Sequence, residues 1–159
     1  MRILVVSDNH GRMGNFLTVY DKVKPVDMVL HLGDTEGTED EIAEAIDCPF
    51  YGVAGNNDFY TILPREQEVE IGKYKALLCH GHYYRVSFTN QMLAEAARQR
   101  GCTLAFYGHI HRPLIDRQEG VTLINPGSLN LPRQENRKPS YVMMDIDRYG
   151  EAHFTICYL

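Results

Sequence analysis

The chain has 159 residues, of which 44% are apolar, and 16 basic and 21 acidic side chains give it a net charge of −5. This length suits one domain with a substantial buried core, so we predict a single domain over residues 1–159. The acidic balance argues against binding to long nucleic acids. No apolar stretch approaches the roughly 20 residues needed to span a bilayer, so we expect no membrane association.

The N-terminus and the cysteines both bear on the compartment. The apolar run after Arg2 is too short for a secretory signal and is typical of a first strand. The four cysteines have no CxxC spacing and no regular framework; they are Cys48, Cys79, Cys102 and Cys157. This pattern predicts reduced thiols in a cytoplasmic protein.

The first third of the chain alternates apolar runs with helical patterns. Residues 2–6, 26–32 and 50–54 are short and rich in branched apolar side chains, which predicts buried strands. Two helices are expected between them, each with a cap residue and a closing proline: Asn15 to Pro25, and Thr38, with Glu41 as its capping-box partner, to Pro49. A βαβαβ order is typical of a parallel sheet.

The rest of the chain is mainly β. Residues 67–78 are interrupted by Gly72-Lys73 and predict a hairpin. A helix is expected over 90–100, with Met92, Leu93, Ala96 and Ala97 on one face and Gly101 at its end. Further strands are expected at 103–107, 114–117, 121–125, 141–147 and 152–158. A parallel start followed by a β-rich end predicts two packed sheets with helices outside.

Polar clusters follow the apolar runs at five places. Taken singly, each is an ordinary turn or helix cap. Together they supply carboxylate, carboxamide and imidazole groups, which suit metal ions of intermediate hardness. Asp8 and His10 lie two residues apart, so an extended backbone would point both side chains the same way. We expect the clusters to meet at the carboxyl ends of the strands. They are Asp8-Asn9-His10, Gly33-Asp34, Gly55-Asn56-Asn57-Asp58, His80-Gly81-His82 and Gly108-His109-Ile110-His111.

The order of these clusters, D-x-H, G-D, G-N-x-D, H-G-H and G-H-x-H, resembles the calcineurin-like metallophosphoesterase superfamily. The short chain and the later Asn125-Pro126-Gly127-Ser128 are similar to the small bacterial and archaeal phosphodiesterase branch of that superfamily. The resemblance covers almost the whole chain. It implies an α/β fold, a four-layer αββα sandwich of two mixed β-sheets flanked by helices, with a dinuclear metal site between the sheet edges.

The resemblance also implies the ligands of two divalent metal ions. One ion would be held by Asp8, His10, Asp34 and His111, and the other by Asp34, Asn56, His80 and His109. A carboxylate at Asp34 suits the bridging position because it offers two oxygens and a negative charge. His10, Asp34 and Asn56 are the residues expected to carry catalysis. Mn²⁺ is the preferred ion, and Ni²⁺, Fe²⁺ or Zn²⁺ are the alternatives.

The predicted activity is hydrolysis of a phosphate ester, above all of a small phosphodiester or nucleotide-like substrate. A hydroxide shared by two cations about 3.5–4 Å apart would attack phosphorus in line. Imidazoles ligate only when neutral, so activity and metal occupancy should fall on acidification. Members of the family form dimers or tetramers, although no interface is visible in this sequence.

One position departs from the family pattern. Many members place a histidine after the motif asparagine as the general acid, and here Asn57 stands in that position. A carboxamide donates a hydrogen bond but does not deliver a proton at useful cost. The hypothesis is that leaving groups of low pKa are favoured, or that water or His82 supplies the proton.

Three alternatives stay open. Cys79 and Arg85 fit C-x5-R, the signature of cysteine-dependent phosphatases, although two bulky rings between them suit phosphate wrapping poorly. The retromer scaffold subunit resembles the same fold and serves as a protein-binding platform with an eroded metal site. DNA-repair nucleases use the same centre, but the acidic charge makes large nucleic acids poor candidates.

Overall fold

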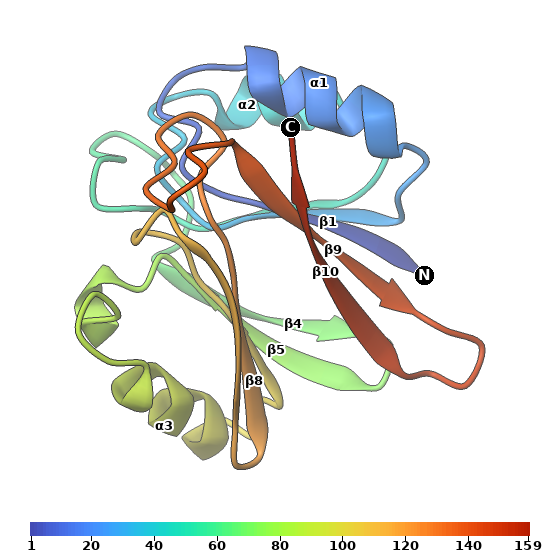
Figure 1. Ribbon diagram of the computed structural model, residues 1–159, viewed down its shortest axis with the longest axis vertical. Helices are drawn as coiled ribbons and strands as arrows, with labels where there is room; N and C mark the ends of the chain where they lie inside the picture. The colour runs from blue at the N-terminus through green and yellow to red at the C-terminus, as the bar shows by residue number, and fades with distance from the viewer.

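Two mixed five-stranded sheets pack face to face and carry helices on their outer faces in the computed structural model, which describes residues 1–159 (Figure 1). The first sheet has the order β10-β9-β1-β2-β3 and contains β1 (Arg2–Val6), β2 (Met28–His31), β3 (Phe50–Gly52), β9 (Ser140–Ile146) and β10 (Ala152–Tyr158). The second has the order β4-β5-β6-β8-β7 and contains β4 (Glu66–Ile71), β5 (Tyr74–Cys79), β6 (Leu104–Phe106), β7 (Pro113–Gln118) and β8 (Val121–Pro126). The predicted fold class is confirmed.

The directions of the strands place the carboxyl ends of the parallel strands at one side of the molecule. In the first sheet β1, β2 and β3 run parallel, which confirms the βαβαβ start. In the second sheet β5, β6 and β8 run parallel, and β4 joins β5 through the predicted hairpin. The carboxyl ends of two sets of parallel strands are therefore available to form one site.

The helices occupy the outer layers. In Figure 1, α1 and α2 cover the first sheet, and α3 lies against the second. Their bounds are α1 (Gly14–Val23), α2 (Glu39–Glu44) and α3 (Gln91–Gln99), and a single 3₁₀ turn, η1, spans His82–Tyr84. The longest of them has 10 residues. None therefore has the length and apolar character of a membrane span.

Two predicted helix caps are wrong. Helix α1 begins two residues earlier than expected, with Met13 in place of Asn15 at the cap position. Asn15 lies inside the helix, where its amide donates to the Leu129 carbonyl at 2.6 Å. Thr38 does precede α2, but it makes no side-chain cap. Its hydroxyl donates instead to the Thr35 carbonyl at 2.8 Å and accepts from the Asn9 amide at 2.8 Å. Both side chains are used to tie loops together, and tertiary contacts have replaced the local caps.

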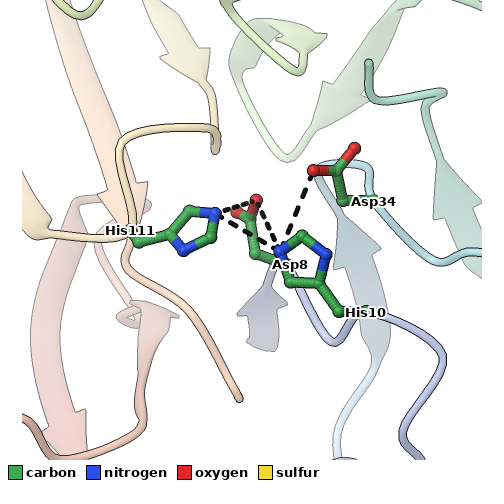
Figure 2. A group of neighbouring side chains, drawn as sticks. All are labelled: Asp8, His10, Asp34 and His111. Carbon is green, nitrogen blue, oxygen red and sulfur yellow. Dashed lines mark hydrogen bonds and ion pairs between the residues drawn. The ribbon is translucent and has the colours of Figure 1, made fainter. Parts of the chain in front are cut away.

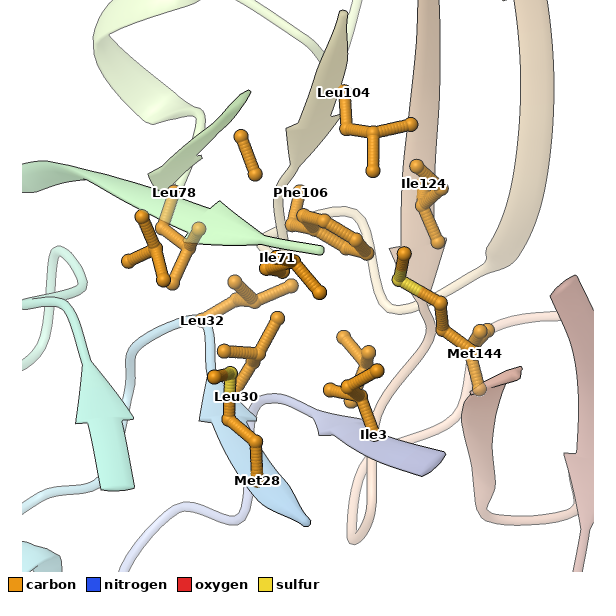
Figure 3. Packing of buried hydrophobic residues seen from close by; sticks show 14 of the residues in the cluster. Ile3, Met28, Leu30, Leu32, Ile71, Leu78, Leu104, Phe106, Ile124 and Met144 are labelled. Atoms are coloured by element: carbon orange, nitrogen blue, oxygen red, sulfur yellow. The ribbon is translucent and has the colours of Figure 1, made fainter. Parts of the chain in front are cut away.

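Strand alternation divides the apolar side chains among three cores. On β1, Ile3 and Val5 enter the central core between the sheets, while Leu4 and Val6 face α1 and α2. The central core contains 15 buried residues drawn from both sheets (Figure 3). A third cluster of 11 buried residues lies between the second sheet and α3. Every strand in the middle of a sheet is thus apolar on both faces, as burial on two sides requires.

The buried face of α3 differs slightly from the prediction. Leu93, Ala94 and Ala97 are buried, whereas Met92 is 48% exposed. The predicted apolar face of α3 therefore wrongly includes Met92, which lies in the first turn of the helix. The fold does not depend on this difference, because a stripe three to four residues apart still faces the sheet.

Candidate metal centre

The five polar clusters meet where the carboxyl ends of the two sheets approach each other. The loop after β1 brings Asp8 and His10, and the loops after β2 and β3 bring Asp34 and Asn56. The loops after β5 and β6 bring the other three histidines, His80, His109 and His111. Main-chain bonds join these loops: Asp8 N–H donates to the Gly33 carbonyl at 3.0 Å, and Gly108 N–H donates to the His80 carbonyl at 3.1 Å. His109 N–H donates to Asp8 Oδ2 at 3.2 Å and joins the two sheets directly.

Four of the side chains form what we call the Asp8 group: Asp8, His10, Asp34 and His111. One donor atom from each lies within 4.8 Å of the others, an arrangement that could hold a metal ion. His111 Nε2 is 3.0 Å from Asp8 Oδ1, and His10 Nε2 is 3.4 Å from His111 Nε2. Figure 2 shows the two imidazoles pointing toward the Asp8 carboxylate from opposite sides.

The remaining side chains form what we call the Asn56 group: Asn56, His80, His109 and the shared Asp34. Asn56 Oδ1 is 2.9 Å from His109 Nδ1 and 3.1 Å from His80 Nε2. Asp34 Oδ2 is 3.6 Å from His80 Nε2 and 3.9 Å from His10 Nε2. The structure therefore brings all seven predicted residues together, and it places Asp34 between the two groups.

Hydrogen bonds on the far side of the imidazoles fix which nitrogen faces inward. Nδ1 of His80 lies 2.6 Å from the Leu32 carbonyl, and Nδ1 of His111 lies 2.7 Å from the Leu131 carbonyl. His10 Nδ1 lies 2.6 Å from a carboxylate oxygen of Glu36. All three partners only accept, so in the neutral rings Nδ1 carries the hydrogen and Nε2 turns a lone pair inward.

The interior of the site is consequently rich in acceptors. Asp8 Oδ1 is buried without a hydrogen-bond partner, although its carboxylate is fully inaccessible to water. An unpaired buried acceptor beside inward-facing lone pairs is costly unless a proton or a cation lies among them. The residues present therefore fit divalent cations on the chemistry of their own donors.

The ionisation of the site follows from burial and close charges. Burial would raise the pKa of Asp8, but His111, which can donate to it when protonated, and the charges of His80 and His111 hold the pKa below its usual value. Burial lowers the pKa of His111, yet Asp8 more than offsets this and leaves the pKa raised. Burial and then the charge of His80 lower the pKa of His109.

The backbone of the clusters is not extended, so the predicted reason for pairing Asp8 with His10 is wrong. Both residues have left-handed φ angles, of 56° and 45°. Asp34, His109 and His111 also have positive φ, at 55°, 69° and 56°. Non-glycine residues rarely adopt this region, and its accumulation at one place is typical of a functional site. The chain turns at each cluster, and the loops, not a flat strand edge, aim the side chains.

Two glycines permit the loops to close on the carboxylates. A Cβ at Gly108 would overlap the Ser7 hydroxyl and crowd Asp8 Oδ2. A Cβ at Gly55 would overlap the carboxylate and backbone of Asp34. In both places the glycine is required for close approach of backbone to a donor.

Several positioning residues were not assigned a role from the sequence. Asp58 accepts from the main-chain N–H groups of Asp34, Gly55 and Glu36, each at 2.7 Å. Ser128 Oγ donates to the Asp8 carbonyl at 2.8 Å. The clusters G-N-x-D and N-P-G-S contained both residues, but only the fold reveals which backbone groups they hold.

Asn57 lies against the shared carboxylate. Its side-chain amide donates to Asp34 Oδ2 at 2.7 Å, and its main-chain N–H donates to Asp34 Oδ1 at 2.9 Å.

His82, the other candidate proton source, is held neutral because burial, and then the charges of His80 and His109, lower its pKa to about 4. His31 is fully buried, and Gly33 N–H donates to its Nδ1 at 3.3 Å.

The cysteine-dependent phosphatase alternative is disfavoured. Cys79 is 3% exposed, and burial raises the pKa of its thiol well above the usual value. A nucleophilic cysteine needs the opposite shift. A left-handed Arg85, with φ of 54°, follows η1, and α3 begins only at Gln91. No helix dipole is therefore placed to stabilise a thiolate.

Comparison with known proteins agrees with this geometry. The family model of the calcineurin-like phosphoesterase superfamily domain matches residues 1–149. A probable metallophosphoesterase of Mycoplasma genitalium is 30% identical to this chain over 162 residues, covering 99% of this chain and 95% of that protein. The crystal structure of a predicted phosphoesterase from Streptococcus pneumoniae superposes with a TM-score of 0.81 at 29% identity, covering 99% and 97% of the two chains.

Two more distant structures share the fold alone. Vps29 of Entamoeba histolytica, in a structure described as a complex with zinc, gives a TM-score of 0.80 at 21% identity and covers 99% of each chain. A structure described as a novel archaeal phosphodiesterase gives a TM-score of 0.75 at 22% identity, covering 99% of this chain and 100% of that one.

Proposed function

This chain belongs to the calcineurin-like phosphoesterase superfamily, and from that membership we propose that it is a dinuclear metal-dependent phosphodiesterase acting on small diesters. The observation that carries the proposal is the convergence of seven donors into two groups that share Asp34. Relatives named as probable metallophosphoesterases support the hydrolase class, and the archaeal phosphodiesterase of the same fold supports the preference for diesters.

The Asp8 group would hold one cation and the Asn56 group the other. When bound, the cations supply an activated water and positive charge for the phosphate oxygens. The protein holds the donors ready: outward bonds from the three Nδ1 atoms keep the Nε2 lone pairs aimed inward. Asp34 would contribute to both sites: its Oδ2 lies 3.6 Å from His80 Nε2 and 3.9 Å from His10 Nε2. Hydrogen bonds from Asn57 to both of its oxygens hold the carboxylate in place.

The donor set bears on the metal. Four imidazoles, two carboxylates and one carboxamide suit borderline ions, and we propose Mn²⁺ first, with Ni²⁺, Fe²⁺ and Zn²⁺ as alternatives. The absence of thiolate among the donors argues against a structural zinc site, which is usually rich in cysteine.

In this proposal no side chain serves as the proton donor to the leaving group, and neither Asn57 nor His82 takes that role. Its amide is engaged with Asp34 and His82 is neutral, so solvent water is the proton source. The rate should then depend steeply on the leaving group, and esters of acidic alcohols such as phenols should be the best substrates. Installing a histidine by Asn57→His should reduce this dependence.

The test is a panel of mono- and diesters, including bis(p-nitrophenyl) phosphate, assayed with each divalent metal after removal of bound metal by chelator. We expect diester hydrolysis that requires added metal and that disappears in His109→Ala while the circular dichroism spectrum is retained. Hydrolysis that persists in chelator, or that is blocked by thiol reagents, would contradict the proposal.

A protein-binding scaffold is the second candidate. The likeness to Vps29 structures supports it through the fold, and large exposed apolar side chains at Phe59, Tyr60 and Ile62 beside the site give it a surface. Against it stands the complete donor set. Absence of turnover with every metal, together with a tight complex with another protein, would favour this alternative.

A further inference from the structure

We propose that the cavity beside His80 is a specificity subsite for a planar aromatic group on the phosphoester, such as a nucleobase or a phenyl ring. The inference rests on the proposed function, because the metal centre would hold the phosphate. The cavity has a volume of about 210 Å³ and is lined by residues that end β5 and follow it, together with Arg65 and Glu66 before β4 and at its start.

The cavity shares a wall with the Asn56 group. His80 lines it and also directs Nε2 toward Asn56 Oδ1 at 3.1 Å. His82 lies between: its ring centroid is 6.0 Å from that of His109 and 4.1 Å from that of Tyr83. A row of rings therefore leads from the proposed metal site to the cavity. In this proposal one ester group of a phosphate held at the metal centre points along these rings toward the cavity.

The walls favour a flat apolar group. Tyr83 and Tyr84 form one side, and buried Cys79 also lines the cavity. Tyr83 is 60% exposed in a position where a bound ring would cover it. Contact between aromatic rings is stabilising beyond the burial of area alone, and stacking tolerates different ring systems.

Unused polar groups in the same cavity call for hydrogen-bond acceptors or donors on the ring. Arg65 makes no ion pair or side-chain hydrogen bond, and its guanidinium carbon lies 5.3 Å from the centroid of the Tyr83 ring. Its neighbour Glu66 is already paired with Arg100 at 2.9 and 3.0 Å, so it does not neutralise Arg65. Buried Nδ1 of His82 also has no partner.

These features select the class of ligand. A ring with oxygen or nitrogen acceptors would pair with Arg65 and cover Tyr83, whereas a glycerol-type alcohol would leave the aromatic wall exposed. The volume lies below the roughly 300–1,000 Å³ of typical drug-sized sites, so it suits one ring system and no dinucleotide.

The experiment compares phenylphosphonate with methylphosphonate as ligands of the Mn²⁺-loaded protein by calorimetry. These probes do not react, so the ratio of their dissociation constants reports the subsite, and the binding of methylphosphonate reports the metal centre. We expect wild type to prefer phenylphosphonate by about tenfold, a difference of about 1.4 kcal/mol. Tyr83→Ala should reduce the preference to about twofold or less, and Tyr83→Phe should retain it.

Tyr149→Ala is the matched control. Tyr149 is 72% exposed and carries an arginine over its ring, with Arg148 Cζ 4.7 Å from the centroid, but it lies in the turn between β9 and β10. This variant should keep the full preference. All variants should bind Mn²⁺ as wild type does, which shows that the fold is intact.

Equal affinity of wild type for the two phosphonates, or an unchanged preference in Tyr83→Ala, would overturn the subsite while leaving the proposed function standing. Failure of both phosphonates to bind, despite bound Mn²⁺, would overturn the subsite and the proposed phosphate site together.

Discussion

The two donor groups share one carboxylate but differ in charge and exposure. The Asp8 group contains two carboxylates, and Asp8 and His111 are 0% and 3% exposed. The Asn56 group contributes a neutral carboxamide in place of the second carboxylate, and Asn56 is exposed. Counting Asp34 in each, the formal charge is −2 on one side and −1 on the other.

This difference in charge and exposure implies that the two proposed ions differ in affinity and in access to substrate. Each added anionic donor strengthens binding of a hard or borderline cation, and burial limits competition by water. The Asp8 group should therefore hold the tighter ion. The Asn56 group, in which Asn56 is exposed and which lies next to the proposed aromatic subsite, should hold a weaker ion that is accessible to substrate.

Replacing the shared residue should have the largest effect, because it removes a donor from both groups. We expect Asp34→Asn to lower diester hydrolysis by more than about 100-fold, beyond the 10–100-fold typical of groups that only support a ligand. Metal content after dialysis, measured by plasma mass spectrometry, should fall below two ions per chain. Two tightly bound ions in this variant would show that Asp34 is not shared.

Removing the carboxylate behind His10 should affect one group alone. Glu36 Oε1 lies 2.6 Å from His10 Nδ1, and Asp58 holds the Glu36 main chain in place. We expect Glu36→Ala to weaken the tighter ion by about 10–100-fold, and Glu36→Gln to weaken it less because the amide oxygen still accepts. Calorimetric titration with Mn²⁺ would measure both affinities.

A matched control tests whether removing the carboxylate from any carboxylate–imidazole pair would also weaken Mn²⁺ binding. Asp147 Oδ2 lies 2.9 Å from His153 Nε2 on the surface, remote from the donors in sequence and strand position. Asp147→Asn should leave both Mn²⁺ affinities unchanged. If Glu36→Ala weakened the two ions equally, the separation into two groups would be wrong.

Adding a negative charge to the Asn56 group should reduce the difference between the two Mn²⁺ affinities. In Asn56→Asp the carboxylate restores a formal −2, and we expect the second ion to bind about tenfold more tightly, a fraction of the roughly 4 kcal/mol between unit charges 4 Å apart near a protein surface. The two calorimetric steps should move closer together. An unchanged second step would mean that position 56 does not contact that ion.

The sequence predicted the donors but not the way the backbone presents them. Strand periodicity and the positions of Asp8, Asp34 and Asn56 after parallel strands were sufficient to place them at one end of the first sheet. The extended backbone expected for Asp8 and His10 was wrong, since both adopt positive φ. Such angles are imposed by bonds between loops, for example His10 N–H to the Asp34 carbonyl at 3.0 Å, which no local pattern encodes.

The supporting residues illustrate the same limit. Asn15 and Thr38 look like helix caps because the local sequence offers their side chains a nearby backbone donor. In the fold, both side chains instead bond to loops around the site. Long-range partners such as Glu36 for His10, and Ser128 for the carbonyl of Asp8, depend on contacts 26 and 120 residues apart.

Acidification should weaken Mn²⁺ binding at the two groups to different extents, and this effect should be smaller than those of the substitutions. In the metal-free protein His111 has a raised pKa, because Asp8 outweighs the effect of burial, and His109 has a lowered one, because burial and His80 oppose its charge. Protons should therefore compete with metal at the Asp8 group at a higher pH than at the Asn56 group. Lowering the pH below 7 should narrow the difference between the two Mn²⁺ affinities.

The same shifts make opposite contributions to stability without metal. The raised pKa of His111 contributes stability that is present below its unfolded pKa and is lost as the pH rises through the folded one. The lowered pKa of His109 makes neutral His109 the stabilising form, and its contribution is lost as the pH falls. Histidine NMR titration of the chelated protein should find His111 protonating before His109 as the pH falls. The reverse order would show that Asp8 does not hold a proton on His111, and the acceptor-rich interior that argues for a cation there would need another explanation.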